Sequence, residues 1–275
     1  AGGAARFRRL FFRDFLPGDN IWQADWVGFA NFERFFKSVM FSRLLVNTLS
    51  LSLYSLAVGF PIPILFALSL NQLRTGLFKQ TVQMISYAPY FISTVVLVGM
   101  LLQFLDLRHG PVNMALTALG RPPIHFMGDA KLFQSIYVWS GVWQYTGFNT
   151  VIYLAVLSTI DPALHEAALV DGANRLQRIW HIDLPGIMPT AITLLILNMG
   201  QIINVGFEKV FLMQNPLNTG VSEVISTYVY KVGLIGGITN YSYASAIGLF
   251  NSVVGLVLLV AANQLMKRLT ESSLW

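Results

Sequence analysis

The sequence contains no cysteine and few charged residues. The absence of cysteine among its 275 residues excludes disulfide bonds, thiolate metal sites and cysteine nucleophiles. Only 11% of the residues are charged and 55% are hydrophobic, whereas a soluble domain has about 25% charged residues. The composition therefore predicts a protein whose apolar surface faces lipid. The formal net charge of +5 is expected to reflect Lys and Arg in cytoplasmic loops, not nucleic-acid binding.

Three kinds of functional motif are also missing. No Gly-x-x-x-x-Gly-Lys-[Ser/Thr] sequence occurs, so the chain has no P-loop to hold ATP phosphates. His165-Glu166 begins like the zinc-protease motif His-Glu-x-x-His, but Leu169 stands where the second histidine is needed. No pair of acids lies inside a hydrophobic run, which disfavours a proton relay and an ion-coupled secondary transporter. The sequence thus predicts neither an enzyme nor a metal site in this chain, and a secondary transporter is kept as an alternative.

Five hydrophobic runs are long enough to cross a bilayer, which takes roughly 20 apolar residues. These runs are residues 44–70, 81–105, 132–160, 187–213 and 243–266. If they alternate in direction, the basic residues of the links 71–80 and 161–186 and those after residue 266 share one side. The positive-inside rule makes that side the cytoplasm. The longer links 106–131 and 214–242 carry mixed charge and are expected to face outward.

The residues before the first run fit this alternation poorly. Arg6, Arg8 and Arg9 resemble a cytoplasmic flank, although the alternation places everything before residue 44 outside. Residues 11–37 suit an outer-interface segment that ends in a short amphipathic helix near residues 31–40. We therefore expect that a first transmembrane helix is missing between residues 9 and 12. The predicted division is a flank at 1–43 and a transmembrane domain at 44–275.

The link of residues 161–189 has the clearest local signals. Asp161-Pro162 predicts a helix start, because proline suits a first-turn position. Gly172 predicts a sharp turn that a residue with a Cβ would resist. A second short helix is expected over residues 174–182, stopped by Pro185, with Pro189 opening the next crossing. The link therefore reads as a pair of rigid cytoplasmic helices.

The same link resembles the "EAA" loop of type I ABC importer permeases. Glu166-Ala167-Ala168 is followed after three residues by Gly172, and after nine more by Ile182-x-Leu184-Pro185. This resemblance implies a coupling helix that docks on an ATP-binding subunit, in which Glu166 would pair with a basic residue of the ATPase. The positions implied to couple the two subunits are Glu166, Ala167, Ala168, Asp171, Gly172, Ile182, Leu184 and Pro185.

Residues 26–32, 47–71 and 78–93 also resemble the oligosaccharide subgroup of these permeases, whose members have one further transmembrane helix at the start. The resemblance implies an all-α membrane bundle with five helices in this chain and six in the intact protein, in the bacterial inner membrane. It implies a second related permease, two ATP-binding subunits that hold ATP and magnesium, and an external solute-binding protein. The implied cargo is an oligosaccharide, and an acidic one such as alginate oligosaccharide is an option. Another small solute stays open.

Polar residues inside the runs have two interpretations. Interhelical hydrogen bonding is one. A sugar pathway is the other, because intramembrane polar residues usually face a bundle interior or a wet cavity. The candidates are Tyr145, Asn149 and Tyr153 in the third run and Asn198, Gln201 and Asn204 in the fourth, each trio expected on one helix face. The spans offer almost no buried cation for an acidic sugar.

Overall fold

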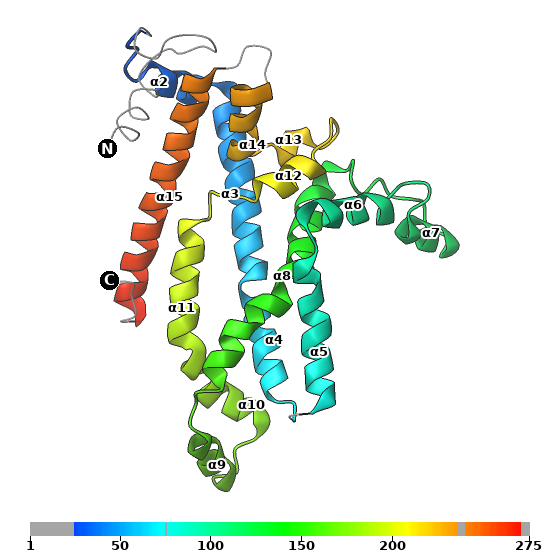
Figure 1. The fold of residues 1–275 in the computed structure, drawn as a ribbon, viewed down its shortest axis with the longest axis vertical. Coiled ribbons are helices and arrows are strands. Elements are labelled where there is room, and N and C mark those ends of the chain that lie inside the picture. The colour runs from blue at the N-terminus through cyan, green and yellow to red at the C-terminus, as the bar shows by residue number, and fades with distance from the viewer. Residues whose placement is uncertain (1–24, 75, 236–239, 271–275) are drawn as a thin grey trace. The chain divides into compact units, whose positions relative to one another are not determined.

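A computed structural model describes residues 25–74, 76–235 and 240–270, with side chains to residue 268. These residues form helices and no β-strand (Figure 1). Three helices are long and apolar enough to cross a membrane, and the number rises to five if each of two bent pairs counts as one span. This agrees with the five predicted runs. The missing helix expected between residues 9 and 12 lies outside the described residues.

The chain divides into two compact units. Unit 1 comprises Ala1–Leu53, Val98–Gln134 and Gln201–Leu258. Unit 2 comprises Tyr54–Leu97, Ser135–Gly200 and Leu259–Trp275. The first helices are α2 (Ala30–Lys37), α3 (Val39–Gly59), α4 (Pro61–Asn71), α5 (Leu77–Tyr87), α6 (Thr94–Phe104), α7 (Pro111–Ala118) and α8 (Ala130–Leu157). The remaining helices are α9 (Pro162–Val170), α10 (Arg175–Arg178), α11 (Leu184–Gly200), α12 (Phe207–Met213), α13 (Thr219–Ser222), α14 (Ile225–Tyr230) and α15 (Tyr241–Thr270).

Two apolar clusters form much of the core of unit 2. Ala67 and Leu68 of α4, Tyr153 and Leu157 of α8, and Ile187 and Ala191 of α11 form the larger cluster. Ile192 and Ile196 of α11 pack with Ala262 of α15 in the second. Helix α8 also approaches α5 so closely that a Cβ at Gly147 would collide with the Ser86 backbone. The glycine is therefore needed for this contact.

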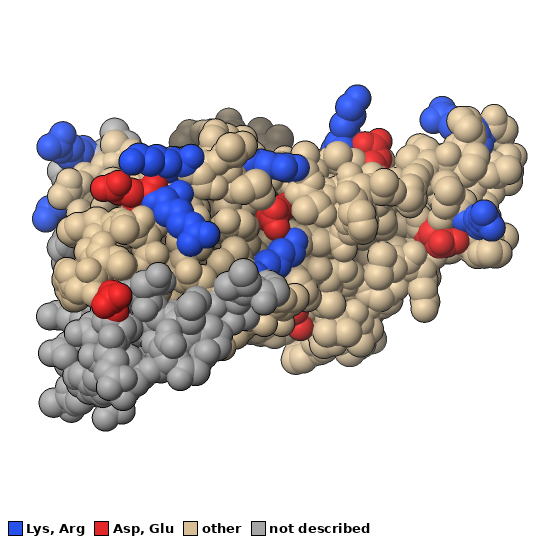
Figure 2. Space-filling model, turned by 90° about the horizontal axis from the view of Figure 1, so that it is seen from above, with Lys and Arg blue, Asp and Glu red and all other residues tan. Residues whose placement is uncertain are grey.

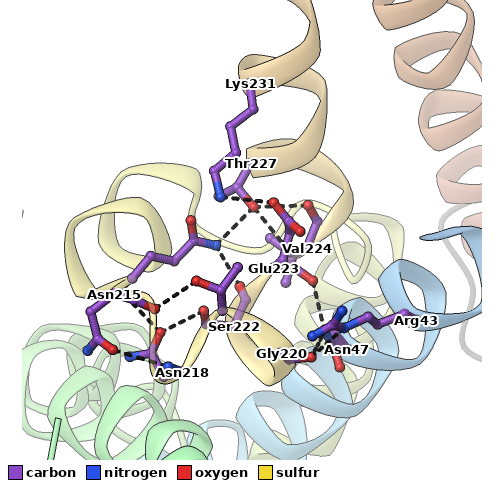
Figure 3. Close-up of polar contacts among 12 residues, drawn as sticks. Arg43, Asn47, Asn215, Asn218, Gly220, Ser222, Glu223, Val224, Thr227 and Lys231 are labelled. Atoms are coloured by element: carbon purple, nitrogen blue, oxygen red, sulfur yellow. Dashed lines mark hydrogen bonds and ion pairs between the residues drawn. The ribbon is translucent and has the colours of Figure 1, made fainter. Parts of the chain in front are cut away.

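Unit 1 is held by aromatic rings and by buried amides. Phe35 of α2 is almost fully buried and lies 5.5 Å, centroid to centroid, from Phe250 of α15. The segment from α12 to α14 is fastened by side chains that bind backbone atoms (Figure 3). Asn47 donates to the carbonyls of Gly220 and Glu223, and Asn218 donates to those of Met127 and Met213. Since buried backbone carbonyls need partners, these amides fix the fold of an otherwise irregular segment.

Charged side chains are sparse and mixed in sign on the face shown in Figure 2. Basic and acidic groups are interspersed there and separated by uncharged surface. Glu223 and Lys231 form one partly buried pair, with 2.8 Å between Oε1 and Nζ.

The predicted run 81–105 is not one straight helix. Residues 77–91 and 94–104 are helical, but the two parts are inclined by 98°. Pro89 lies in a 3₁₀ turn over Ala88–Phe91, Ile92 is extended, and the Ser93 hydroxyl accepts from Val96 N–H. The bend follows because the proline has no N–H and Ser93 restarts the helix.

The predicted run 187–213 was also wrong in its bounds. The helix begins at Arg175 and ends at Gly200, a length of 26 residues. It therefore starts before the predicted run and ends before residues 201–213 of that run. Gln201 and Asn204 lie beyond the end of α11, where Asn204 N–H donates to the Gln201 carbonyl. Asn198, Gln201 and Asn204 therefore do not share one helix face.

The second short helix at residues 174–182 is likewise not separate. Helices α10 and α11 are joined through a wide π turn, Ile179–Asp183, in which Leu184 N–H donates to the Ile179 carbonyl. Neither Pro185 nor Pro189 stops this helix. The wide turn lies immediately before Pro185, whose missing N–H would interrupt an ordinary α-helical ladder.

Candidate functional site

The predicted coupling loop is built from three local capping arrangements. At its start, the Asp161 carboxylate accepts from Ala163 N–H at 2.9 Å, and Pro162 occupies the first turn of α9. A carboxylate at this position satisfies an N–H that the helix leaves free. The chain bends sharply just before this cap, and α9 is inclined by 76° to α8.

The C-terminal end of α9 is closed by a glycine turn. Gly172 has a φ of +80°, and Ala173 N–H donates to the Ala168 carbonyl at 2.8 Å. Gly172 N–H donates to Leu169, which completes a Schellman arrangement. The predicted sharp turn at Gly172 is therefore confirmed, and a residue with a Cβ would be strained there.

The third arrangement starts α10. The Asn174 side chain accepts from Gln177 N–H at 2.9 Å, and the Gln177 side chain accepts from Asn174 N–H at 2.8 Å. This reciprocal capping box satisfies two N–H groups at once. Together with the Asp161 cap and the Gly172 turn, it gives the loop a defined shape without a hydrophobic core of its own.

The loop exposes several large apolar side chains. Helix α9 contains no buried residue, and in Figure 1 it extends beyond the ends of α4, α5 and α11. Val170 is 88% exposed, Leu176 76% and Trp180 67%. These exposed apolar side chains make the loop a candidate docking surface.

A hollow of about 310 Å³ lies between α9 and the α10 segment. Its lining residues are Ala168, Asp171, Gly172, Ala173, Gln177, Arg178, His181 and Ile182. Glu166 and Ala167 of α9 are exposed and lie outside this hollow. Pro185 of α11 is also exposed and is not among the lining residues. Leu184 instead packs against the core cluster of unit 2. The structure therefore brings part of the predicted coupling set around one concavity and places Leu184 in the scaffold beneath it.

The three pathway candidates on α8 have different environments. Tyr145 and Asn149 are exposed, whereas Tyr153 is only 3% exposed and belongs to the core cluster. Tyr145 lies 6.1 Å from Tyr90, centroid to centroid, and Tyr90 stacks on Phe148 at 3.8 Å. Tyr90 and Phe148 were missed by the sequence analysis, because their stacking joins two segments that are far apart in the chain.

The pathway candidates after Met199 form a chain of amides in unit 1. Asn204 donates to Gln201 Oε1 at 2.9 Å, and Asn251 of α15 donates to Asn204 Oδ1 at 3.1 Å. Asn251 was missed, since no pattern in its own helix singles it out. By contrast, Asn198 donates to the Leu194 carbonyl of its own helix. Gln201, Asn204 and Asn251 therefore form the linked polar group.

Lys209 of α12 is a buried basic residue in unit 1. Its side chain is 7% exposed, and burial lowers its pKa to about 8. Desolvation disfavours the ammonium form, which is the cause of the shift. Lys209 lies within the predicted run 187–213 but beyond the helix end at Gly200, so it is a buried cation of that run outside the helical span.

Comparison with known proteins decides the family. Residues 59–271 match the family described as binding-protein-dependent transport system inner membrane component. The chain belongs to this family of permeases. Protein LplB of Bacillus subtilis (strain 168) is 41% identical over 266 residues, which cover 97% of this chain and 83% of the relative. The polygalacturonan/rhamnogalacturonan transport system permease protein YteP of the same organism is 40% identical, covering 97% of this chain and 82% of the relative.

A solved structure agrees in fold with this permease. It is the crystal structure of a bacterial alginate ABC transporter in complex with an alginate pentasaccharide-bound periplasmic protein. One of its chains has a TM-score of 0.86 and 42% identity, covering 90% of this permease and 85% of that chain. The predicted all-helical ABC importer permease fold and the inner-membrane location are thereby confirmed.

The permease site contains no sign of a metal centre within the ranges that the structure describes. No group of three or more His, Cys, Asp or Glu side chains that could hold a metal ion occurs there. The roles of the individual coupling and pathway residues stay predictions, because they follow from the motif and from exposure. Most of the coupling residues lie in one exposed loop, whereas the pathway residues differ in environment: Tyr145 and Asn149 are exposed and Tyr153 is buried.

Proposed function

We propose that this permease forms part of the translocation pathway for an oligosaccharide and couples its movement to ATP hydrolysis by partner subunits. The observation that carries the proposal is the exposed loop of residues 161–189, whose caps define its shape and whose apolar side chains lack cover. A coupling role requires both properties, since a flexible link would absorb a displacement instead of passing it on.

The proposed assembly contains a second related permease, two ATP-binding subunits and an extracytoplasmic solute-binding protein. The ATP-binding subunits supply the nucleotide and magnesium sites, in keeping with the absence of a P-loop from this sequence. The coupling surface comprises Glu166, Ala167, Ala168, Asp171, Gly172 and Ile182. ATP drives the change of state only if the ATP-bound subunits bind one conformation of the loop better than the other.

The proposed cargo is an oligosaccharide with acidic sugars. Two of the similar proteins are described as transporting polygalacturonan or rhamnogalacturonan and alginate, and alginate is an acidic polysaccharide. The amide chain of Gln201, Asn204 and Asn251 offers both donors and acceptors, which suit hydroxyl groups. The exposed Tyr145 and Asn149 are a second group of pathway candidates. Tyr153 serves as a core residue in this scheme.

The decisive experiment reconstitutes the permease with its partner subunits and its solute-binding protein in lipid vesicles. Alginate and polygalacturonate oligosaccharides should stimulate ATP hydrolysis and enter the vesicles, whereas neutral maltooligosaccharides of equal length should do neither. Stimulation by the neutral sugars alone would overturn the acidic cargo. Uptake that proceeds without any ATP-binding subunit would overturn the coupling role.

Substitution of Asn204 tests the pathway assignment in the same vesicles. Asn204→Leu removes the central amide of the chain and should raise the concentration of oligosaccharide needed for half-maximal stimulation, while the amount of assembled complex stays unchanged. Thr117→Ala is a control, because the Thr117 hydroxyl bonds only within α7, to the Asn113 carbonyl. Equal behaviour of the two variants would remove Asn204 from the pathway.

A further inference from the structure

One carboxylate in the described part of the chain is fully buried, although it lies within the coupling loop of residues 161–189. Asp183 has an exposed fraction of 0% and is the last residue of the π turn that joins α10 to α11. In the EAA motif this position is the variable residue between Ile182 and Leu184. A buried acid is costly unless hydrogen-bond donors surround it, and Asp183 has such donors.

Three donors from two other helical segments converge on this carboxylate. His165 Nε2 of α9 lies 3.3 Å from Asp183 Oδ1. Gln72 Nε2 donates to Oδ2 at 3.0 Å, and Asn71 Nδ2 reaches Oδ1 at 3.5 Å. Asn71 and Gln72 form the C-terminal end of α4. An ionised carboxylate has about four acceptor positions, so one side chain can serve all three donors.

The contact with His165 is the polar link between α9 and the helices behind it. Among the residues that the structure describes, His165 is the α9 side chain with an ion pair or hydrogen bond to another helical element. The rest of α9 lacks buried residues. A second, apolar contact lies at its base, where the Ile160 side chain fills the space beside Gly186. Without Asp183, α9 would be held by its base and by its two chain connections.

The π turn explains why the carboxylate points inward. Each residue of an α-helix advances by about 100° around the axis, so the one extra residue of a π turn rotates all that follows by that amount. Such turns occur frequently at functional sites. Here the turn lies between the exposed α10 surface and the first buried residues of α11, and Asp183 lies at its end.

We propose that Asp183 is a positioning residue that locks the coupling helix α9 to α4 and α11, so that a displacement of α9 moves both transmembrane helices. Helices α4 and α11 contribute Ala67, Leu68, Ile187 and Ala191 to the core cluster that they share with α8. The carboxylate therefore adds a polar connection from α9 to two helices of this cluster. This inference rests on the proposed coupling function and names the residue that transmits it.

The test measures the ratio of oligosaccharide transported to ATP hydrolysed in the reconstituted complex. Asp183→Asn keeps the shape of the side chain but places an NH₂ group against donors. It should lower the ratio at least tenfold while ATP hydrolysis continues, and Asp183→Glu should recover part of it. Glu33→Gln is the matched control, since Glu33 forms an exposed pair with Lys37 and the same carboxylate-to-amide change there should leave the ratio unchanged.

His165→Asn keeps the test decisive if Asp183→Asn fails to assemble. It removes the α9 contact and leaves Asn71 and Gln72 on the carboxylate, so it should also lower the ratio and should speed amide hydrogen exchange across residues 162–170. The double variant should lose no more than Asp183→Asn alone, because both changes break one connection. A wild-type ratio in His165→Asn, or losses that multiply in the double variant, would overturn the proposal.

The two proposals fail in different ways. If the wild-type complex shows no ATP-dependent uptake but His165→Asn still speeds exchange in α9, the connection exists and the coupling function is wrong. If the wild-type complex transports normally and neither variant changes the ratio or the exchange rate, the coupling function stands and the role of Asp183 is wrong.

Discussion

Substitution of Gly172 tests the coupling loop most directly, because the structure isolates one physical effect there. The residue has a φ of +80°, and no atom lies within 4 Å of where a Cβ would be. Gly172→Ala therefore adds backbone strain without a collision inside the chain. Left-handed backbone costs an alanine about 1–2 kcal/mol, which corresponds to a factor of about 5–30 in an equilibrium constant.

The strain should weaken the docking of the ATP-binding subunit. The loop is exposed and lacks a core, so the cost shifts a local equilibrium between the native turn and opened forms. A partner that binds only the native turn then loses apparent affinity in proportion to the lost population. We expect a loss of up to about 5–30-fold for Gly172→Ala and a smaller loss for Gly172→Asn, since asparagine tolerates this conformation better. Gly172→Trp should lose more than Gly172→Ala if a partner covers the surface.

Gly120 provides a matched control in the link after α7. Its φ is +72°, it has no atom within 4 Å of a Cβ position, and Arg121 N–H donates to the Leu116 carbonyl in the same Schellman pattern. Gly120→Ala should lower thermal stability as much as Gly172→Ala. Titration of the permease with fluorescently labelled ATP-binding subunit should distinguish them. Equal affinities for the two variants would refute the docking role of the loop.

Three further outcomes are expected. Asn174→Ala removes the capping box and should cost about 1 kcal/mol, measured as faster hydrogen exchange at the start of α10 with the ATPase affinity reduced. Asn149→Leu should change the oligosaccharide preference of ATPase stimulation while the amount of assembled complex is unchanged, and identical preference would remove this residue from the pathway. Gly147→Ala should cost about 1–3 kcal/mol by overpacking against Ser86, measured as a lower melting temperature. Gly248→Ala, with open space at its Cβ position inside α15, should not lower the melting temperature and should raise it slightly, because alanine is the better helix former.

The local signals of the loop were predictable from the sequence. The cap at Asp161 and the turn at Gly172 depend on hydrogen bonds within a few residues, so residue type and spacing suffice to identify them. The start of α10 at Asn174 follows for the same reason. Membrane spans were found because length and apolar composition are sufficient criteria. What these features share is that no distant residue is needed to form them.

The continuity of helices was less predictable. Pro185 was expected to end a helix, but a π turn before it lets the helix continue into α11. The 98° bend after Phe91 and the helix end at Gly200 were missed as well. Hydropathy reports that a segment is apolar, but it does not report where the backbone bends, because neighbouring helices can satisfy the disturbed hydrogen bonds.

The polar partnerships were not predictable at all. Asp183 meets Gln72 across 111 positions of sequence, and Asn251 meets Asn204 across 47. Tyr153 was expected beside Asn149 in a pathway, yet it is buried in the core. A single sequence gives the periodicity of one helix but not the helix that faces it, so it cannot decide whether a polar side chain is a partner, a core residue or a surface group.

The distinction between local and distant contacts also separates two steps of the proposed mechanism. The caps at Asp161, Gly172 and Asn174 maintain the surface that a partner binds, so damage to them should reduce affinity and leave the yield per ATP intact. The contacts of Asp183 connect that surface to α4 and α11, so their loss should reduce the yield by more than it reduces affinity. If instead every loop variant changed affinity and yield in fixed proportion, docking and transmission would be one event, and a separate connection behind the loop would not be needed.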